Sequence, residues 1–274
     1  VEPLVSVNMC VWRPNREYFR TAVSSVLAQT LEAFELIIVE DPSEIDGRSL
    51  LGELLSDQRV VYLKNRERTG LVAQRNRALA LSRGEYVAFL DADDYAEPVR
   101  LEKQVEWVCA NTTVSFVGTW ITLMDENGKI FGLRRYPCSS SAVTRAMEFY
   151  CAMAFPSVMC RRVVVEKLGG FRGGSFVTDY DLWCRAVGAG YLCDNIPEPL
   201  VRYRVHSCAR TRKYVRRVLY QTVKTKIRNF GLRLSFQGYL RIVSEIACLL
   251  LPANLVDYVF RRLTFEQVKT GSGE

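Results

Sequence analysis

The sequence lacks any long uninterrupted hydrophobic run. The longest candidate, IACLLLPANLVDYVF at residues 246–260, is interrupted by Pro252 and carries Asp257. A membrane-spanning helix needs about 20 consecutive apolar residues, so we expect none here. Residues 1–11 also lack a basic segment of the kind that opens a signal peptide, so we expect no signal peptide. With 274 residues, 49% of them hydrophobic, the chain can form one large α/β domain or a domain with an extension.

The sequence also lacks a paired cysteine motif. None of its nine cysteines forms a C-x-x-C pair, which argues against a zinc ribbon or a redox motif. Several cysteines stand in apolar surroundings, namely Cys10, Cys109, Cys160 and Cys248. We therefore expect reduced, buried thiols and a cytoplasmic protein.

Acidic residues are scarce in the C-terminal quarter of the chain. Residues 201–262 hold 14 lysines and arginines but only Glu245 and Asp257, whereas residues 1–200 hold 22 basic and 26 acidic residues. The excess of basic residues fits either solvated helix faces or a surface for an anionic membrane or substrate, and both interpretations remain open. The basic region has no interleaved aromatic residues in a recognisable motif, so we expect no nucleic-acid partner.

The first hundred residues alternate between strand-like and helix-like patterns. Short apolar runs predict strands at 4–11, 34–40, 59–64 and 86–90, and helical spacing predicts helices at 16–29, 48–56 and 71–84. This order predicts an α/β fold with a Rossmann-like, doubly wound, mostly parallel sheet flanked by helices. Ligands of such sheets bind at the carboxyl ends of the strands.

The pattern is looser after residue 100. We predict helices at 100–110, 142–154 and 179–191, strands at 114–125 and 199–206, and a strand followed by a short helix at 158–171. From residue 212 to about 263 the chain reads as mostly helical, which predicts a C-terminal helical extension.

Three carboxylates follow the predicted strand at 86–90. The stretch YVAFLDADD ends in Asp91, Asp93 and Asp94. The two preceding strand ends, Val11-Trp12 and Glu40-Asp41, are expected at the same crevice. A helix N-cap would account for one or two of these aspartates. A divalent cation accounts for all three, because Mg²⁺ and Mn²⁺ prefer oxygen ligands, completed by water and phosphate.

Four segments, in this order, resemble the family 2 glycosyltransferases, which have the GT-A fold. They are VSVNMCVWRPN (5–15), SVLAQTLEAFELIIVEDPS (25–43), GLVAQRNRALALSRGEYVAFLDADD (70–94) and TDYDLWCRA (178–186), and YRVHSCARTR (203–212) also resembles the family. The resemblance, over about residues 4–212, implies an inverting enzyme of polysaccharide or cell-envelope biosynthesis. It would move a sugar from a nucleotide-sugar donor, expected to be a UDP-sugar, to a hydroxyl of a glycan or lipid-linked acceptor.

The resemblance also implies a division of the chain. A GT-A domain is expected at 1–210, with its nucleotide-binding half at about 1–98 and its acceptor-side half at about 99–210. A basic helical extension would occupy 211–274. We expect this extension to place the acceptor, and basic amphipathic helices are suited to peripheral contact with the inner face of an anionic membrane.

The resemblance assigns roles to individual residues. The residues implied in donor binding are Val11, Trp12, Asp41, Arg75, Asp91, Ala92 and Asp93. Asp41 would hold the nucleobase, with Trp12 stacked beside it. Asp91 would contact the ribose, and Asp93 would bind Mn²⁺ or Mg²⁺ together with His206, the only histidine. The family's usual D-D-G-S reads E-D-P-S here, and Pro42 stiffens the loop that contacts the base.

The implied catalytic base is Asp179, which would accept the proton of the attacking hydroxyl. The family's usual Glu-Asp pair reads Thr178-Asp179 in this chain. Each assignment has a structural alternative: Asp179 as a helix N-cap, Trp12 at the edge of the core, Arg75 on a helix surface, and His206 as a surface or core residue.

Two other functions remain open. A nucleotidyltransferase would be expected to carry a glycine-rich, basic phosphate loop after the first strand, but the sequence there is CVWRPNRE, without glycine. A catalytically inactive nucleotide-sugar-binding module would keep the fold, and the departures at Pro42 and Thr178 are compatible with it.

Overall fold

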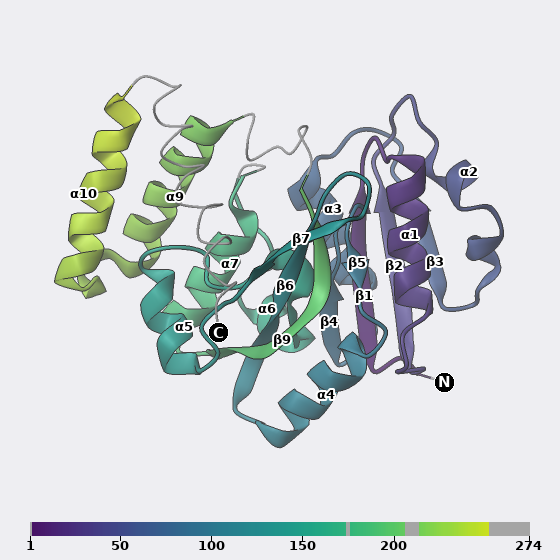
Figure 1. Cartoon of the computed structure of the whole chain (residues 1–274), viewed down its shortest axis with the longest axis horizontal. Coiled ribbons are helices and arrows are strands. Elements are labelled where there is room, and N and C mark those ends of the chain that lie inside the picture. The colour runs from purple at the N-terminus through teal and green to yellow at the C-terminus, as the bar shows by residue number, and fades with distance from the viewer. Residues whose placement is uncertain (1, 174–175, 206–213, 252–274) are drawn as a thin grey trace.

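The computed structural model describes residues 2–173, 176–205 and 214–251, and Figure 1 shows the whole chain. The elements are β1 (Val5–Val11), α1 (Arg16–Leu27), β2 (Phe34–Glu40), α2 (Gly47–Leu51), η1 (Gly52–Ser56), β3 (Val60–Lys64), α3 (Leu71–Leu81), β4 (Tyr86–Phe89), β5 (Tyr95–Ala96), α4 (Arg100–Ala110), β6 (Val114–Met124), β7 (Ile130–Arg134), α5 (Ser140–Met147), η2 (Phe155–Ser157), β8 (Met159–Arg161), α6 (Arg162–Lys167), α7 (Thr178–Gly188), β9 (Leu192–Arg204), α9 (Val215–Phe230), η3 (Gly231–Arg233) and α10 (Phe236–Leu250).

One sheet runs through the molecule in the order β3-β2-β1-β4-β8-β6-β9-β5, with β7 paired to β6. Its first four strands are parallel, as the sequence predicts. Helix α1 covers one face of these strands, where Val23 packs with Val7 and Leu36. Helix α3 covers the other face, where Ala78 packs with Ile37 and Val39. The parallel part is therefore wound on both faces.

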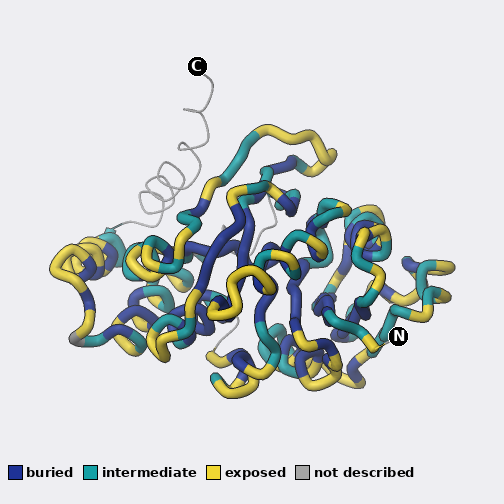
Figure 2. The backbone as a smooth tube through the Cα atoms, turned by 90° about the horizontal axis from the view of Figure 1, so that it is seen from below, coloured by how far each residue is buried: buried dark blue, intermediate teal, exposed yellow. Residues whose placement is uncertain are grey.

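The second half of the sheet is mixed. Strand β8 is antiparallel to both β4 and β6, whereas β6 and β9 pair in parallel. Helix α7 packs beneath this half through Trp183, which is fully buried against Phe89 and Phe116. Figure 2 shows the central strands as a buried band with exposed segments around it.

The C-terminal helices pack on the core of this second half. Val223 and Phe230 of α9 share a buried cluster with Trp183, and so does Ile242 of α10. Inside this contact the ammonium of Lys226 is fully buried and donates to Glu245 at 2.7 Å and to the carbonyl of Phe149 at 2.9 Å. This buried ion pair joins α9 to α10, and the bond to Phe149 ties both to the segment that follows α5.

Three sequence-based predictions need correction. The helix expected at 142–154 ends at Met147, and a 3₁₀ turn at Phe155–Ser157 follows. The strand expected at 199–206 begins at Leu192, because β9 pairs along nearly the whole of β6. Cys109, expected to be buried, is exposed. The eight cysteines within the described residues are free thiols.

Candidate active site

The ends of three adjacent parallel strands form the floor of the site. Val11 of β1 pairs with Glu40 of β2, so Trp12 and Asp41 follow at the same edge. On the other side of β1, Asn8 pairs with Phe89 of β4, and this register brings Asp91 to the level of Cys10. Burial raises the pKa of the Cys10 thiol to about 12, and the charges around that thiol are those of Arg75, Asp91 and Asp41. The convergence predicted from sequence is confirmed.

The turn after β4 does not cap a helix. Strand β5 follows it at Tyr95–Ala96, and α4 begins only at Arg100 with Val99 at its N-cap. Asp94 is buried and accepts a hydrogen bond from the backbone N–H of Arg204 at 2.8 Å. The Arg204 guanidinium donates to the carbonyl of Asp93 at 2.9 Å. A partner 110 residues away in the chain thus holds the turn and its half-buried Asp91 and Asp93 in place.

This turn concentrates negative charge. Burial, and then the charges of Asp93 and Asp91, raise the pKa of Asp94 well above its ordinary value. Tyr203 of β9 lies against the same group, since burial and the charges of Asp94, Asp91 and Asp93 raise the pKa of its phenol. Within the described residues, no three carboxylate, thiol or imidazole groups are placed to hold a metal ion together. A divalent cation at this turn would therefore take few oxygens from the protein and complete its shell with water and phosphate. His206, the second predicted ligand, lies outside the described residues.

Asp41 is buried and accepts four hydrogen bonds. Its Oδ1 accepts from Asn65 at 2.6 Å and from the Thr69 hydroxyl at 2.9 Å. Its Oδ2 accepts from the N–H groups of Thr69 at 3.0 Å and Gly70 at 2.7 Å. Burial alone would raise the pKa of Asp41, but the bonds from Asn65, Gly70 and Thr69 outweigh burial and lower it. Asp41 therefore fixes the loop that enters α3, and a nucleobase N–H would have to displace one of these donors.

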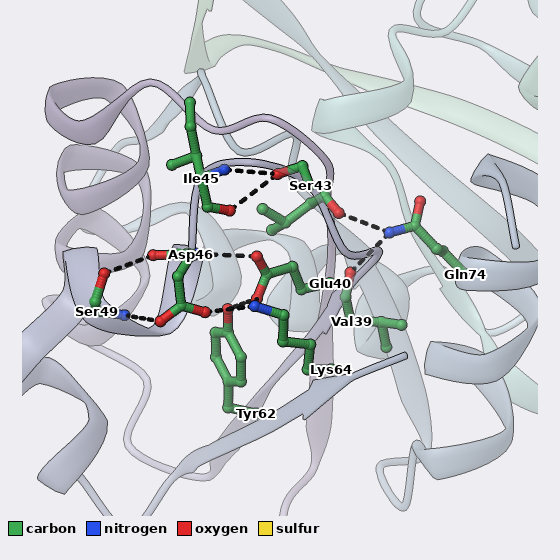
Figure 3. A network of polar contacts seen from close by, with 11 residues as sticks. Val39, Glu40, Ser43, Ile45, Asp46, Ser49, Tyr62, Lys64 and Gln74 are labelled. Carbon is green, nitrogen blue, oxygen red and sulfur yellow. Dashed lines mark hydrogen bonds and ion pairs between the residues drawn. The ribbon is translucent and has the colours of Figure 1, made fainter. Parts of the chain in front are cut away.

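Glu40, beside Asp41, has a different task. Its buried carboxylate accepts from the Tyr62 hydroxyl and from the N–H of Gly47 at 2.9 Å, and Lys64 lies 3.7 Å away (Figure 3). Lys64 also pairs with Asp46 at 2.5 Å. Any side chain at Gly47 would place a Cβ 2.9 Å from the Tyr62 oxygen. The network anchors both ends of the loop that contains Pro42, so the first acidic residue of E-D-P-S is structural.

Val11 and Trp12 form the wall next to Asp41. The Val11 side chain is buried, and its carbonyl accepts from the N–H of Asp41 at 2.9 Å and from Gln74 at 2.7 Å. Figure 3 shows Gln74 reaching across to the carbonyl of Val39 as well, at 3.1 Å. Trp12 is half-buried outside the core, and the guanidinium of Arg68 lies 3.9 Å from the centre of its ring. Its other neighbour, Arg13, lies 4.7 Å from the ring.

Arg75 is a buried cation, which excludes the helix-surface alternative. It is 7% exposed, and its Nη1 donates to the Thr178 hydroxyl at 2.5 Å. Its guanidinium lies 3.5 Å from the ring centre of Phe155 and 5.2 Å from that of Phe171. Its buried Nε has no hydrogen-bond partner, and no ion pair joins it to a carboxylate within the described residues. A buried charge of this kind favours an anionic ligand.

Asp179 and Asp181 stand in the first turn of α7 in contrasting surroundings. Asp181 is buried and paired with Arg185 at 2.9 Å and with Arg228. Asp179 is half-buried, and within the described ranges no hydrogen bond or ion pair ties its carboxylate to another residue. The N-cap of α7 is Val177, with φ of 51° and no side-chain cap, so Asp179 does not cap the helix. Of the two carboxylates, only Asp179 is available to a substrate.

Sequence reasoning missed several residues that build the site. Arg204 lies in the quoted segment YRVHSCARTR, yet only its histidine was assigned a role. The partners of Asp41, Asn65 and Thr69, lie in a polar loop with no distinguishing pattern. Gln74 reads as an ordinary helical residue. Its burial depends on the packing of α3 against β1 and β2, and the sequence carries no signal for it.

Comparison with known proteins places this geometry in context. The profile of the family described as Glycosyl transferase family 2 matches residues 6–169. An uncharacterized glycosyltransferase of Methanocaldococcus jannaschii is 32% identical over 74% of this chain and 71% of its own length. The O-antigen biosynthesis glycosyltransferase WbnJ of Escherichia coli is 33% identical over 74% and 80%, respectively. The E. coli UDP-Glc:alpha-D-GlcNAc-diphosphoundecaprenol beta-1,3-glucosyltransferase WfaP is 28% identical over 74% and 78%.

Solved structures share the architecture. S. aureus TarS 1–349 in complex with UDP-GlcNAc superposes with a TM-score of 0.65 at 15% identity, covering 95% of this chain and 74% of that one. The mannosyltransferase PcManGT from Pyrobaculum calidifontis, in complex with GDP-Man and Mn²⁺, gives 0.61 at 17% identity, covering 97% and 82%. At these identities the likeness concerns the fold, and it confirms the predicted GT-A architecture.

Proposed function

Because this chain belongs to glycosyl transferase family 2, we propose that it transfers a sugar, with inversion, from a UDP-sugar to a hydroxyl of a glycan or lipid-linked acceptor. One observation carries the proposal. The carboxylates of Asp41 and Asp91 lie at the ends of β2 and β4, the two strands that flank β1, and Arg75 links this crevice to the helix that bears Asp179. The complex of TarS with UDP-GlcNAc and the name of WfaP support UDP as the nucleotide and a lipid-linked acceptor.

The donor would lie over the ends of β1, β2 and β4. Trp12 and Asp41 would bound the nucleobase site, and the Asn65–Gly70 loop held by Asp41 would form its far wall. Asp91, Ala92 and Asp93 would line the ribose and diphosphate. Arg75 would supply positive charge to the anionic donor, since its own guanidinium lacks a carboxylate partner within the described residues.

The carboxylates of the turn would offer oxygen ligands to a divalent cation. Asp93, with His206 as the second predicted ligand, would hold Mn²⁺ or Mg²⁺. The bound ion would neutralise charge on the diphosphate. The complex of PcManGT with Mn²⁺ supports the choice of metal.

Asp179 would act as the general base. Its carboxylate would take the proton of the acceptor hydroxyl, whose oxygen then bonds to the anomeric carbon of the donor sugar. The bond from that carbon to the diphosphate oxygen breaks, and its electron pair leaves with the nucleoside diphosphate. Attack from the face opposite the leaving group inverts the anomeric centre. Asp181 takes no part, because Arg185 and Arg228 hold it.

The proposed division of labour follows the halves of the chain. Residues of about 1–98 would bind the nucleotide, those of about 99–210 would bind the acceptor, and the extension from 211 would position the acceptor. We place the reaction in the cytoplasm, at the inner face of the membrane, and assign no role to nucleic acid.

A panel of nucleotide sugars tests the proposal. The protein is incubated with UDP-, GDP- and dTDP-sugars and Mn²⁺, and both the melting temperature and the release of nucleoside diphosphate are measured. We expect a UDP-sugar to raise the melting temperature and to be slowly hydrolysed, and hydrolysis to be lost in Asp179→Asn. Binding without release in every case would support the alternative, an inactive nucleotide-sugar-binding module. A donor that binds equally well without any divalent ion would contradict the metal assignment.

A further inference from the structure

The C-terminal helices carry many of the exposed large hydrophobic side chains of this protein. Within the described residues, fifteen large hydrophobic side chains are exposed, and eight of them lie on α9 and α10. These eight are Tyr220, Ile227, Phe236, Tyr239, Leu240, Val243, Ile246 and Leu250. Large exposed apolar patches on a folded protein mark surfaces that meet a partner or a membrane.

On α10 the exposed residues form a stripe along one side. Phe236, Leu240, Val243 and Leu250 recur at helical spacing and are exposed by 76%, 55%, 62% and 83%, respectively. We call these four residues the α10 stripe. The opposite side of the helix, with Gly238, Ile242 and Glu245, is buried against the protein. The helix is therefore apolar on two sides but packs on the protein with only one.

The segment that carries the stripe has an excess of positive charge. Residues 214–251 contain seven lysines and arginines and one acidic residue, Glu245. Glu245 is buried and paired with Lys226 and Arg241, so it presents no negative charge to the outside. The basic residues that remain exposed include Arg217, Lys224 and Arg233. Exposed apolar side chains and exposed cations on the same C-terminal helices match the interior and the headgroups of an anionic bilayer.

The position of α10 suits contact with a surface. Figure 1 shows it at the end of the molecule opposite α2, with no other labelled element outside it. Within the part of the chain that the structure describes, no helix is long and apolar enough to cross a membrane. The other side of α10 is fixed to the protein, so the stripe can lie in the headgroup region of a bilayer while the helix stays folded on the protein.

We propose that the α10 stripe inserts into the headgroup region of an anionic lipid bilayer, while the exposed arginines and lysines of α9, η3 and α10 bind the lipid headgroups. This surface would hold the enzyme at the membrane, where a lipid-linked acceptor is found. Vesicle binding is measured without donor or acceptor, so failure of this inference and failure of the proposed transfer are distinguishable.

Co-sedimentation of the full chain with vesicles tests the proposal. Vesicles of phosphatidylcholine alone are compared with equal parts of phosphatidylcholine and phosphatidylglycerol, at low and high salt. We expect binding to the anionic vesicles that weakens as salt rises. Leu240→Glu with Val243→Glu should weaken binding by at least roughly tenfold, because two charges enter the inserted face. Phe131→Glu is the matched control: Phe131 is 51% exposed but lies on β7, and its variant should bind like the parent.

A second variant, which removes one exposed charge, tests the proposal even if the double glutamate variant does not fold. Arg233→Gln should weaken binding to anionic vesicles roughly fivefold, the contribution of one basic residue near such a surface.

Two other occupants of the stripe are a second copy of the chain and the segment 252–274. If Leu240→Glu with Val243→Glu turns a dimer into a monomer and leaves vesicle binding unchanged, the stripe is a contact between copies and the proposal is overturned. Absence of binding to anionic vesicles at low salt also overturns it and favours cover by 252–274.

Discussion

The Nη1 of Arg75 lies 2.5 Å from the hydroxyl oxygen of Thr178, 103 residues further along the chain. This hydrogen bond joins α3, which carries the wall of the proposed donor site, to the first residue of α7, which carries the proposed base. Thr178 gives the guanidinium a neutral partner, and no carboxylate pairs with Arg75 within the described residues. We therefore propose that an anionic ligand balances the positive charge of Arg75.

Arg75→Lys is expected to weaken nucleotide binding by about tenfold or more, because a lysine lacks the planar group that stacks on Phe155 and reaches Thr178. Calorimetric titration with UDP and Mn²⁺ measures the effect. Arg145→Lys, at an exposed position on α5, is the control and should bind like the parent. Equal affinity in both variants would remove Arg75 from the donor site.

Asp179→Asn is expected to lower kcat by about 10²- to 10⁴-fold with little change in donor affinity, because only the proton acceptor is lost. Asp181→Asn, two residues away, should instead destabilise the fold by about 3 kcal/mol, since Arg185 would lose its buried carboxylate partner. Steady-state kinetics and urea unfolding of both variants measure the contrast. Exchange of the two phenotypes would show that the roles have been assigned to the wrong carboxylates.

Asp41→Asn is expected to lower both nucleotide affinity and thermal stability. The new amide group would face N–H donors of Thr69 and Gly70 that now bond to a carboxylate oxygen, and each buried donor left unpaired costs about 1–3 kcal/mol. Thermal melting without ligand, followed by titration with UDP, separates the two effects. Lower affinity with an unchanged melting temperature would mean that Asp41 acts on the base alone and does not support the loop.

Chelation of divalent ions is expected to abolish the stabilisation of the protein by UDP. The same loss should appear in Asp93→Asn with Mn²⁺ present, because the carboxylate next to the diphosphate is gone. Thermal shift with UDP, with and without Mn²⁺, measures it. Asp57→Asn, at a half-buried position where the carboxylate pairs with Arg59, should keep the full shift. A shift in the parent that survives chelation would contradict the role given to Asp93.

Lys226→Met is expected to destabilise the protein by about 3 kcal/mol, because Glu245 would keep only the exposed Arg241 as its partner. Lys224→Met on the same helix should change the free energy of unfolding by less than about 0.5 kcal/mol, since Lys224 is exposed. Urea unfolding of both variants gives the comparison. Equal effects would mean that the buried pair does not fix the helical extension to the rest of the chain.

Much of the nucleotide side could be predicted from the sequence, because there local patterns coincide with tertiary structure. A buried parallel strand has a continuous apolar sequence, so the strand predicted for FELIIVE coincides with β2. The predicted strand ends also indicate where Asp41 and Asp91 lie. The acceptor side was less readable. The first half of strand β9 was not predicted, because Pro197 and Pro199 argue against a strand. Pairing with β6 nevertheless keeps these residues within β9.

The contacts that complete the site could not be read from any local pattern. The bond from Arg204 to Asp94 spans 110 residues, and that from Asn76 to the carbonyl of Phe171 spans 95. Asp94 stands in a distinctive acidic stretch, but the neighbours of Arg204 and Phe171 in the sequence give no sign of these bonds. The burial of Arg75 likewise follows from the docking of α3 against Phe155 and Phe171, which lie 80 residues or more away.

Crystals grown or soaked with Mn²⁺ and UDP, GDP or dTDP in turn give the most direct measurement of the central claim. The account predicts that UDP lies over the ends of β1, β2 and β4, with an anomalous peak for Mn²⁺ about 2.1 Å from a carboxylate oxygen of Asp93 and in contact with the diphosphate. Manganese bound away from Asp93, or nucleotide bound elsewhere with all three diphosphates, would contradict it.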